Sequence, residues 1–464
     1  MASSQARRQG AQGARRAAQQ RTPRTSTATP SPRLRSVPVT NRRSHPSALL
    51  ATPASPQLRI TGELNDRQKR DRDAIVRSLV VMLISSTVLV ILGVIMVFSA
   101  TSATSINAVA VYGPDVELFS VAIKQAISVG IGLALGLMMA VIPYTWVERL
   151  SWWILALGLG LQAAVLLVGT SVNGNKNWLN LGPMQIQPSE FLKLAMIVWL
   201  AHTLARLQLK EIHSELTLVL PGLGFVAASA LVVAGGDMGT GIIYVLIGGG
   251  MFWIAGIRNR VLFILGFLAS FFAVAMIARA PSRILRVRDF ISNLFSTPDA
   301  IDPTQSEFAQ YAFGSGGVTG VGLGAGREKW RDLAEAHTDF IFAVIGEELG
   351  LFGAVTVIVL FLALGWSFVH MIAHLRSRYA RLVVIGVALW LCGQALINMC
   401  VVTGLLPVFG VPLPFLSQGG SSMMASLLAL GVVFACGLGA PGVREALTIR
   451  GSLARRARSV MRRG

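Results

Sequence analysis

The chain has 464 residues, of which 53% are hydrophobic and 14% charged, and it contains three Cys. This composition, with a mean hydropathy of +0.61, excludes a soluble enzyme, a disulfide-rich scaffold and a wholly disordered protein. The hydrophobic residues occur in runs of roughly twenty, which is long enough to cross a ~30 Å hydrocarbon core. The sequence therefore predicts an all-α, polytopic membrane protein.

The net charge of +19 lies almost entirely in the two ends of the chain. Residues 1–77 carry 16 Lys and Arg against 4 Asp and Glu, and residues 444–464 carry 7 against 1. We expect residues 1–77 to be a disordered basic tail, 78–440 to be the membrane domain and 441–464 to be a second basic tail. Such tails favour anionic membrane lipids as partners and not nucleic acid.

Ten hydrophobic runs, taken in chain order, predict ten membrane spans. They are residues 79–99, 118–142, 152–172, 189–205, 216–234, 239–256, 261–278, 340–369, 382–402 and 420–439. An even number places both basic tails on one side, and alternate loops on that side carry Arg and Lys. The positive-inside rule then predicts a multi-pass protein of the cytoplasmic (inner) membrane with both termini in the cytoplasm.

The predicted outer loop at residues 279–336 breaks this charge rule, because it carries seven Lys and Arg together with seven Asp and Glu. Arg283, Arg286 and Arg288 lie in its first part. A loop of this length is either functional or disordered, and its aromatic and charged composition favours function.

Charged side chains also occur inside the predicted spans. Lys124 and Gln125 interrupt the second span, and Glu190 and Lys193 lie in the first turn of the fourth. A charge inside the membrane costs at least ~2.5 kcal/mol, so it normally faces a partner or a wet cavity. Snorkelling to the membrane surface is the alternative for Glu190 and Lys193. Asp237, between the fifth and sixth spans, is expected to be a solvated turn residue.

Several ionisable residues cluster where the eighth span is predicted to begin. His337, Asp339, Glu347 and Glu348 lie within twelve residues of one another, which indicates a network at a membrane surface. Acids that cap a helix N-terminus are the competing interpretation. The glycine-rich stretches Gly314–Gly317 and Gly320–Gly326 predict backbone that can approach a ligand closely.

Three motifs in order along the chain resemble one family. They are Asn177–Gly182 with Gln187–Leu194, His337–Ala343 with Gly346–Gly350, and Pro412–Ser422. All three are similar to motifs of the SEDS family, the membrane glycosyltransferases of shape, elongation, division and sporulation. The resemblance covers about residues 78–440, and it is greater to the division branch than to the elongation branch.

The resemblance implies that the chain polymerises lipid II into a glycan strand on the outer face of the membrane during cell division. It also implies a class B penicillin-binding protein and other division proteins as partners. The family's catalytic acid corresponds to Asp302 in Asp302-Pro303. Because the Gly-Tyr pair that usually precedes the nearby Gln is missing, Asp299 is the alternative. Lys124-Gln125 stands where the family has Arg-Gln, which keeps the charge but not the bidentate fork.

In the implied reaction, Asp302 takes a proton from the acceptor sugar, and the leaving diphosphate needs only positive charge. Lys193 could serve the diphosphate or pair with Asp302. The expected substrate-binding residues are Lys124, Gln125, Glu190, Lys193, Arg283, Arg286, Arg288, His337, Asp339 and Glu347. No cofactor is required by this scheme, and a divalent cation such as Mg²⁺ or Mn²⁺ is an open addition.

Two other functions fit intramembrane charges. A lipid II flippase would be expected to show inverted repeats, and we find no convincing repeat. A non-catalytic scaffold of the division machinery would tolerate neutralisation of the outer-loop acids.

Overall fold

The structure is a computed structural model, and it describes most of the predicted membrane domain. The described residues are 64–112, 120–172, 175–180, 182, 185–207, 215–278, 281–295, 303–330 and 335–448. Both predicted catalytic candidates, Asp299 and Asp302, lie outside these residues, as does most of each predicted tail.

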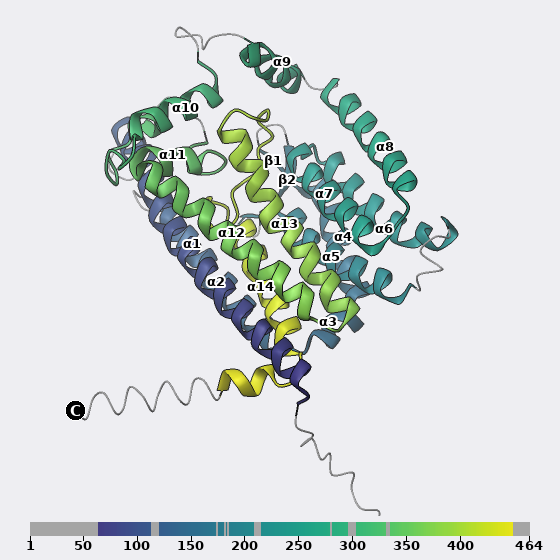
Figure 1. Ribbon diagram of the computed structural model, residues 1–464. Coiled ribbons are helices and arrows are strands. Elements are labelled where there is room, and N and C mark those ends of the chain that lie inside the picture. Colours follow the sequence, from purple (N-terminus) through teal and green to yellow (C-terminus); the bar gives the residue numbers. More distant parts are fainter. Residues whose placement is uncertain are drawn as a thin grey trace, which may run out of the picture. The chain divides into compact units, whose positions relative to one another are not determined.

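Helices make up nearly all of the regular structure (Figure 1). They are α1 (Asp66–Tyr112), α2 (Ser120–Val141), α3 (Tyr144–Arg149), α4 (Ser151–Val168), α5 (Pro188–Arg206), α6 (Glu215–Ala234), α7 (Met238–Ala255), α8 (Asn259–Ala278), α9 (Pro281–Phe295), α10 (Gln305–Gly316), α11 (Ile341–Glu348), α12 (Gly350–His374), α13 (Arg378–Val402) and α14 (Gly420–Leu438). The predicted all-α class is confirmed.

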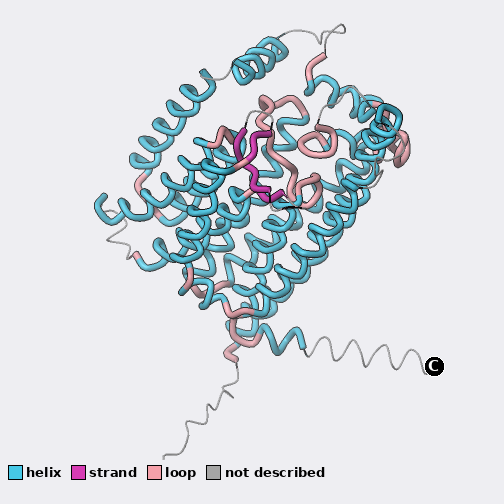
Figure 2. The backbone as a smooth tube through the Cα atoms, turned by 180° about the vertical axis from the view of Figure 1, so that it is seen from behind, coloured by secondary structure: helices cyan, strands magenta, loops and turns pink. Residues whose placement is uncertain are grey.

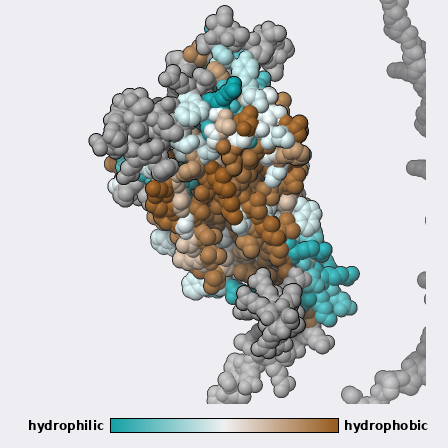
Figure 3. Space-filling model, turned by 90° about the vertical axis from the view of Figure 1, so that its left-hand side faces the viewer, coloured by the Kyte–Doolittle hydropathy of each residue, from teal (hydrophilic) through white to brown (hydrophobic). Residues whose placement is uncertain are grey.

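Eight of the described helices are long and apolar enough to cross a membrane, namely α1, α2, α4, α6, α7, α12, α13 and α14. The other two predicted spans correspond to α5 and α8. Figure 3 shows one face of the protein, on which hydrophobic side chains cover the middle and hydrophilic side chains gather toward the ends. This distribution fits a protein whose middle lies in lipid.

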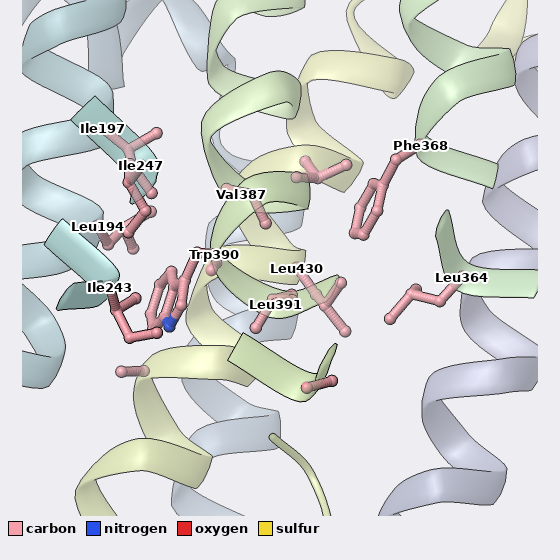
Figure 4. Packing of buried hydrophobic residues seen from close by; sticks show 14 of the residues in the cluster. Leu194, Ile197, Ile243, Ile247, Leu364, Phe368, Val387, Trp390, Leu391 and Leu430 are labelled. Atoms are coloured by element: carbon pink, nitrogen blue, oxygen red, sulfur yellow. The ribbon is translucent and has the colours of Figure 1, made fainter. Parts of the chain in front are cut away.

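The centre of the bundle is formed by α5, α13 and α14. Within the apolar windows of α14 and α13, 83% and 61% of residues are buried, and nearly every residue of α5 is buried. Trp390 of α13 packs between Leu194 of α5 and Ile243 of α7, while Leu391 faces Leu430 of α14 (Figure 4). The first turn of α5, with its charges, is therefore held in the interior.

Glycines allow α2 and α14 to pack backbone against backbone. A Cβ atom added at Gly431 would lie 2.3 Å from the Gly136 carbonyl oxygen, and one added at Gly136 would lie 2.7 Å from the Leu427 carbonyl oxygen. Small residues at such contacts are typical of helix pairs in membranes, where close packing drives association.

A small antiparallel sheet lies between α4 and α5, in the order β1 (Thr170–Val172), β2 (Asn175–Asn180), β3 (Gln185–Ile186) (Figure 2). Thr170 pairs with Trp178, and Leu179 pairs with Ile186. The sheet leads directly into Pro188, the first residue of α5.

Besides the small sheet, the structure differs from the sequence prediction in the following elements. Helix α1 begins at Asp66, inside the predicted tail. The predicted eighth span is two helices, because the chain breaks at Leu349–Gly350, where Gly350 has a φ of +67°. The predicted outer loop contains α9, α10 and the 3₁₀ turn Glu328–Trp330.

The glycine-rich stretches of the outer loop pack against the protein's own backbone. A Cβ atom added at Gly316 would clash with the Gly346 carbonyl oxygen, and one added at Gly320 would lie 2.2 Å from the Glu348 carbonyl oxygen. The Val321 amide also donates to the Glu347 carbonyl at 3.0 Å. These glycines thus bring the outer loop onto the α11–α12 junction.

Candidate functional site

The first turn of α5 carries a buried ion pair. Lys193 Nζ lies 2.8 Å from Glu190 Oε1, and the side chains are 1% and 2% exposed. Pro188 begins the helix, where a missing backbone N–H costs nothing. Because both charged side chains are buried and paired with each other, the alternative interpretation that they snorkel to the membrane surface is wrong.

Lys193 connects α5 to α13. Its Nζ also donates to Gln394 Oε1 at 3.0 Å and lies 4.8 Å from the centre of the Trp390 ring. Gln394 in turn donates through Nε2 to the Pro412 carbonyl at 2.7 Å. The ammonium thus has one carboxylate, one amide and one aromatic face around it, which satisfies a charge removed from water.

Glu190 retains an unused acceptor. Its Oε2 is buried and has no hydrogen-bond partner among the residues that the structure describes. A buried carboxylate oxygen without a donor is costly, so such an atom marks a place where a ligand, proton or water can bind.

Asp237 lies close enough to this pair to share its field. The Thr240 amide donates to its Oδ1 at 2.9 Å, which caps α7, and Gln187 Nε2 donates to its Oδ2 at 3.0 Å. Burial raises the pKa of this carboxyl, the Thr240 amide opposes the rise, and the charge of Glu190 adds to it. The prediction that Asp237 is a solvated turn residue is wrong, because its exposed fraction is 8%.

Helix α13 and the segment between α13 and α14 hold the residues that precede α11. Ser417 Oγ donates to the Thr338 carbonyl at 2.6 Å, the Gln418 amide donates to the His337 carbonyl at 2.8 Å, and Asn398 Nδ2 donates to the Asp339 carbonyl at 2.7 Å. Two separated sequence motifs are thereby joined.

Asp339 is the acid of this motif whose ionisation is most perturbed. Burial raises its pKa to about 7, the charges of Glu335 and Asp237 add to the rise, and Arg286 lowers it. Burial also lowers the pKa of His337. A predicted outer-loop cation, Arg286, and the α7 cap, Asp237, therefore both act on the charge of the same carboxyl.

Gln125 and Lys124 have different surroundings. Gln125 is 2% exposed, donates through Nε2 to the Ser417 carbonyl at 3.3 Å and accepts from the Gly419 amide at 3.3 Å. Lys124, the preceding residue of α2, is exposed. Only Gln125 therefore touches the segment that leads into α14.

Glu347 and Glu348 face the outer loop instead of the Lys193 network. Glu347 Oε1 accepts from the Arg327 amide at 2.6 Å. Glu348 pairs with Lys329, and both side chains are fully buried. Ser99 of α1 donates to both oxygens of Glu348, at 2.8 and 2.7 Å. This cluster anchors the outer loop to α1 and α11.

The remaining predicted residues are only partly described. Arg286 and Arg288 are exposed on α9, whereas the side chain of Arg283 lies outside the described part of the chain, together with Asp299 and Asp302. Among the described residues, no group of three His, Cys, Asp or Glu side chains could hold a metal ion.

Four polar residues of the site were not predicted from the sequence, namely Gln187, Gln394, Asn398 and Ser417. Gln394 and Asn398 are four residues apart in an apolar run, so they share one helix face. That spacing was the available signal, since polar side chains inside a span normally face a partner.

Comparison with known proteins gives consistent results. A family model for FtsW, RodA and SpoVE, described as cell cycle proteins, matches residues 79–437. Stage V sporulation protein E of Bacillus subtilis is 36% identical over 360 residues, covering 76% of this chain and 94% of that relative. A Marinobacter nauticus protein named probable peptidoglycan glycosyltransferase FtsW is 36% identical over 362 residues, covering 76% and 88%.

A solved structure has the same fold. It matches with a TM-score of 0.61 and 25% identity over 78% of this chain and 97% of the other, and it comes from work on the structural coordination of polymerization and crosslinking by a peptidoglycan synthase complex.

Proposed function

Because the chain belongs to the FtsW/RodA/SpoVE family, we propose that it is the peptidoglycan glycosyltransferase that polymerises lipid II into β-1,4 glycan strands for the division septum. The relatives named peptidoglycan glycosyltransferase FtsW support the enzyme class. The division role rests on the greater resemblance of its motifs to the division branch.

The observation that carries the proposal is the buried Glu190–Lys193 pair with its open carboxylate oxygen. A structural ion pair gains most when every lone pair is satisfied, and here one is not. The pair lies at the N-terminus of α5, whose dipole also favours anions. The open carboxylate oxygen can accept a hydrogen bond from a sugar hydroxyl, while the cation and the helix N-terminus favour the diphosphate joined to that sugar.

The chemistry follows from the substrate. Asp302, or Asp299 as the alternative, removes the proton from the 4-hydroxyl of the acceptor N-acetylglucosamine. That oxygen attacks the anomeric carbon of the donor N-acetylmuramic acid as the bond to the diphosphate breaks. The electron pair leaves with the diphosphate, so one displacement inverts the α-linked donor into a β bond.

The leaving diphosphate needs no acid, because its charge can be stabilised directly. The cations proposed to stabilise the leaving diphosphate are Lys193, Arg283, Arg286, Arg288 and Lys124. Asp339, whose pKa is about 7, can hold a proton at neutral pH and donate it as a hydrogen bond to a substrate oxygen. Gln125 and His337 are the remaining residues proposed to bind the substrate. Glu347 contributes by holding the outer loop in place.

The likeness to a peptidoglycan synthase structure supports a cross-linking partner. We assign this role to a class B penicillin-binding protein, which would receive the nascent glycan strand. The eight apolar helices make the chain a multi-pass membrane protein, and we place both termini on the cytoplasmic side of the cell membrane from the charge of the loops.

One assay separates this function from its alternatives. Purified chain, with and without the partner, is incubated with fluorescent lipid II in liposomes, and products are resolved on a gel. Polymer is the expected result. Movement of lipid II across the bilayer without polymer would instead indicate a flippase, and neither activity would indicate a scaffold.

A further inference from the structure

A cavity lies at the end of the bundle where α1 begins and α14 ends, and it takes no part in the proposed reaction. Its volume is about 260 Å³. The first turns of α1, the end of α12 and the start of α13 contribute its walls. Among the lining residues are the basic side chains Arg72, His374 and Arg376, with Asp71 as the acidic one.

Among the residues that the structure describes, the two arginines form ion pairs with partly exposed partners. Arg376 Nη2 lies 3.1 Å from Asp71 Oδ2, with side chains 51% and 21% exposed, and Arg72 Nη2 lies 3.1 Å from Asp73 Oδ1. Water screens such pairs, so they contribute little. A phosphate oxygen could therefore recruit both guanidinium groups through charge-assisted hydrogen bonds.

His374 adds a third group to the same wall. Its Nδ1 lies 2.7 Å from the His370 carbonyl oxygen. This contact makes Nδ1 the protonated nitrogen in the neutral ring and leaves Nε2 as the second polar atom.

Part of the remaining wall is apolar, with Ile75, Leu375 and Cys436 all buried, and Gln68, Tyr144 and Ser377 add polar groups. The cavity lies level with the ends of two membrane helices, since the apolar helix α12 ends at His374 and α13 begins at Arg378. Apolar walls beneath a basic rim at the end of membrane helices match the boundary between acyl chain and headgroup.

We propose that this cavity, lined by Arg72, His374 and Arg376, binds a phosphate ester of glycerol. The ester oxygens accept from the arginines, and the glycerol carbons contact the apolar wall. An anionic phospholipid and a soluble glycerol phosphate share this chemistry, and the experiment distinguishes them.

Thermal unfolding of the detergent-solubilised full chain tests the proposal. The chain is titrated with phosphatidylglycerol, glycerol 3-phosphate and inorganic phosphate, and phosphatidylcholine is the reference. Phosphatidylglycerol should raise the melting temperature saturably. A shift with phosphatidylglycerol alone identifies a lipid, and a shift with glycerol 3-phosphate or inorganic phosphate as well identifies soluble phosphate chemistry. Both results support the site, whereas an equal shift with phosphatidylcholine overturns it.

Variants then locate the effect. Arg72→Gln with Arg376→Gln should raise the half-saturating concentration roughly tenfold, as expected for lost charge-assisted bonds. Arg260→Gln, which removes an exposed arginine outside the cavity, should change it less than about twofold. An equal response in these two variants would contradict the proposal.

Asp71→Asn tests the site without removing a cation, in case the double variant does not fold. This change frees Arg376 from its acidic partner, so the half-saturating concentration should fall. A rise would overturn the proposal.

Discussion

Lys193 and Glu190 form an ion pair in the interior of the helical bundle, with 2.8 Å between Nζ and Oε1 and almost no exposed surface on either side chain. Lys193 completes its surroundings with Gln394 and Trp390, whereas Glu190 keeps one oxygen without a described hydrogen-bond partner. The ammonium of Lys193 therefore has a full set of partners, whereas the carboxylate of Glu190 has one oxygen that lacks a described hydrogen-bond donor.

Breaking this pair from one side should be more harmful than removing both charges. Lys193→Met alone leaves Glu190 buried and unpaired, so the free energy of unfolding should fall by about 3–5 kcal/mol. Adding Glu190→Gln should recover part of that loss. A double-mutant cycle by thermal unfolding in detergent measures the coupling, and additive losses would show that the two side chains do not interact.

Stability should depend on pH through Asp339. Its folded-state pKa is raised to about 7 from the ordinary value of 3.8, so the folded protein binds the proton more tightly than the unfolded chain. Stability contributed by this proton is complete below about pH 4 and is lost as the pH rises to about 7. Asp339→Asn should make the melting temperature less dependent on pH over that range.

Asp66→Asn is the matched control for this pH series, because the Asp66 side chain is 91% exposed. It should leave the pH profile of the wild type unchanged. Parallel profiles for Asp339→Asn and the wild type would show that Asp339 does not carry the effect.

The contact between α2 and α14 should tolerate no added methyl group at Gly431. Gly431→Ala places a Cβ atom 2.3 Å from the Gly136 carbonyl oxygen, so the helices must separate, at a cost of about 1–3 kcal/mol. Gly130→Ala on α2 meets no atom within 4 Å and should be neutral or slightly stabilising. Equal melting temperatures for the two variants would contradict the packing described.

The cluster of Lys329, Glu348 and Ser99 should control the mobility of the outer loop. Lys329→Met leaves the fully buried Glu348 without its cation, so the loop should detach and become more sensitive to protease, with cleavage at least several-fold faster. Lys124→Met, at an exposed position, serves as the control. Unchanged cleavage in Lys329→Met would mean that other contacts hold the loop.

Hydropathy predicts the helices of this protein well, because each span must satisfy its own backbone in lipid. It does not predict the break at Leu349–Gly350, since both flanking segments are apolar and the break occurs where Gly350 has a positive φ and lies against Gly320. The β1–β3 sheet is equally hidden, because its strands are short and polar.

The charged residues of the site are visible in the sequence, whereas their pairing is not. Glu190 and Lys193 stand out because charges are rare in spans. Their neighbour Gln394 lies 201 positions from Lys193, and only the packing of α5 against α13 brings the two together. The sequence does not predict the burial of Asp237, because a turn residue is buried only when other parts of the chain cover the turn.

The most direct measurement is the rate of glycan formation from purified lipid II by wild type, Asp302→Asn and Asp299→Asn. The account predicts that Asp302→Asn binds lipid II and melts at the wild-type temperature, yet polymerises at least about a hundredfold more slowly. Asp299→Asn should stay close to wild type, and the reverse order would move the role to Asp299. Wild-type rates in both variants would contradict a carboxylate base in the outer loop.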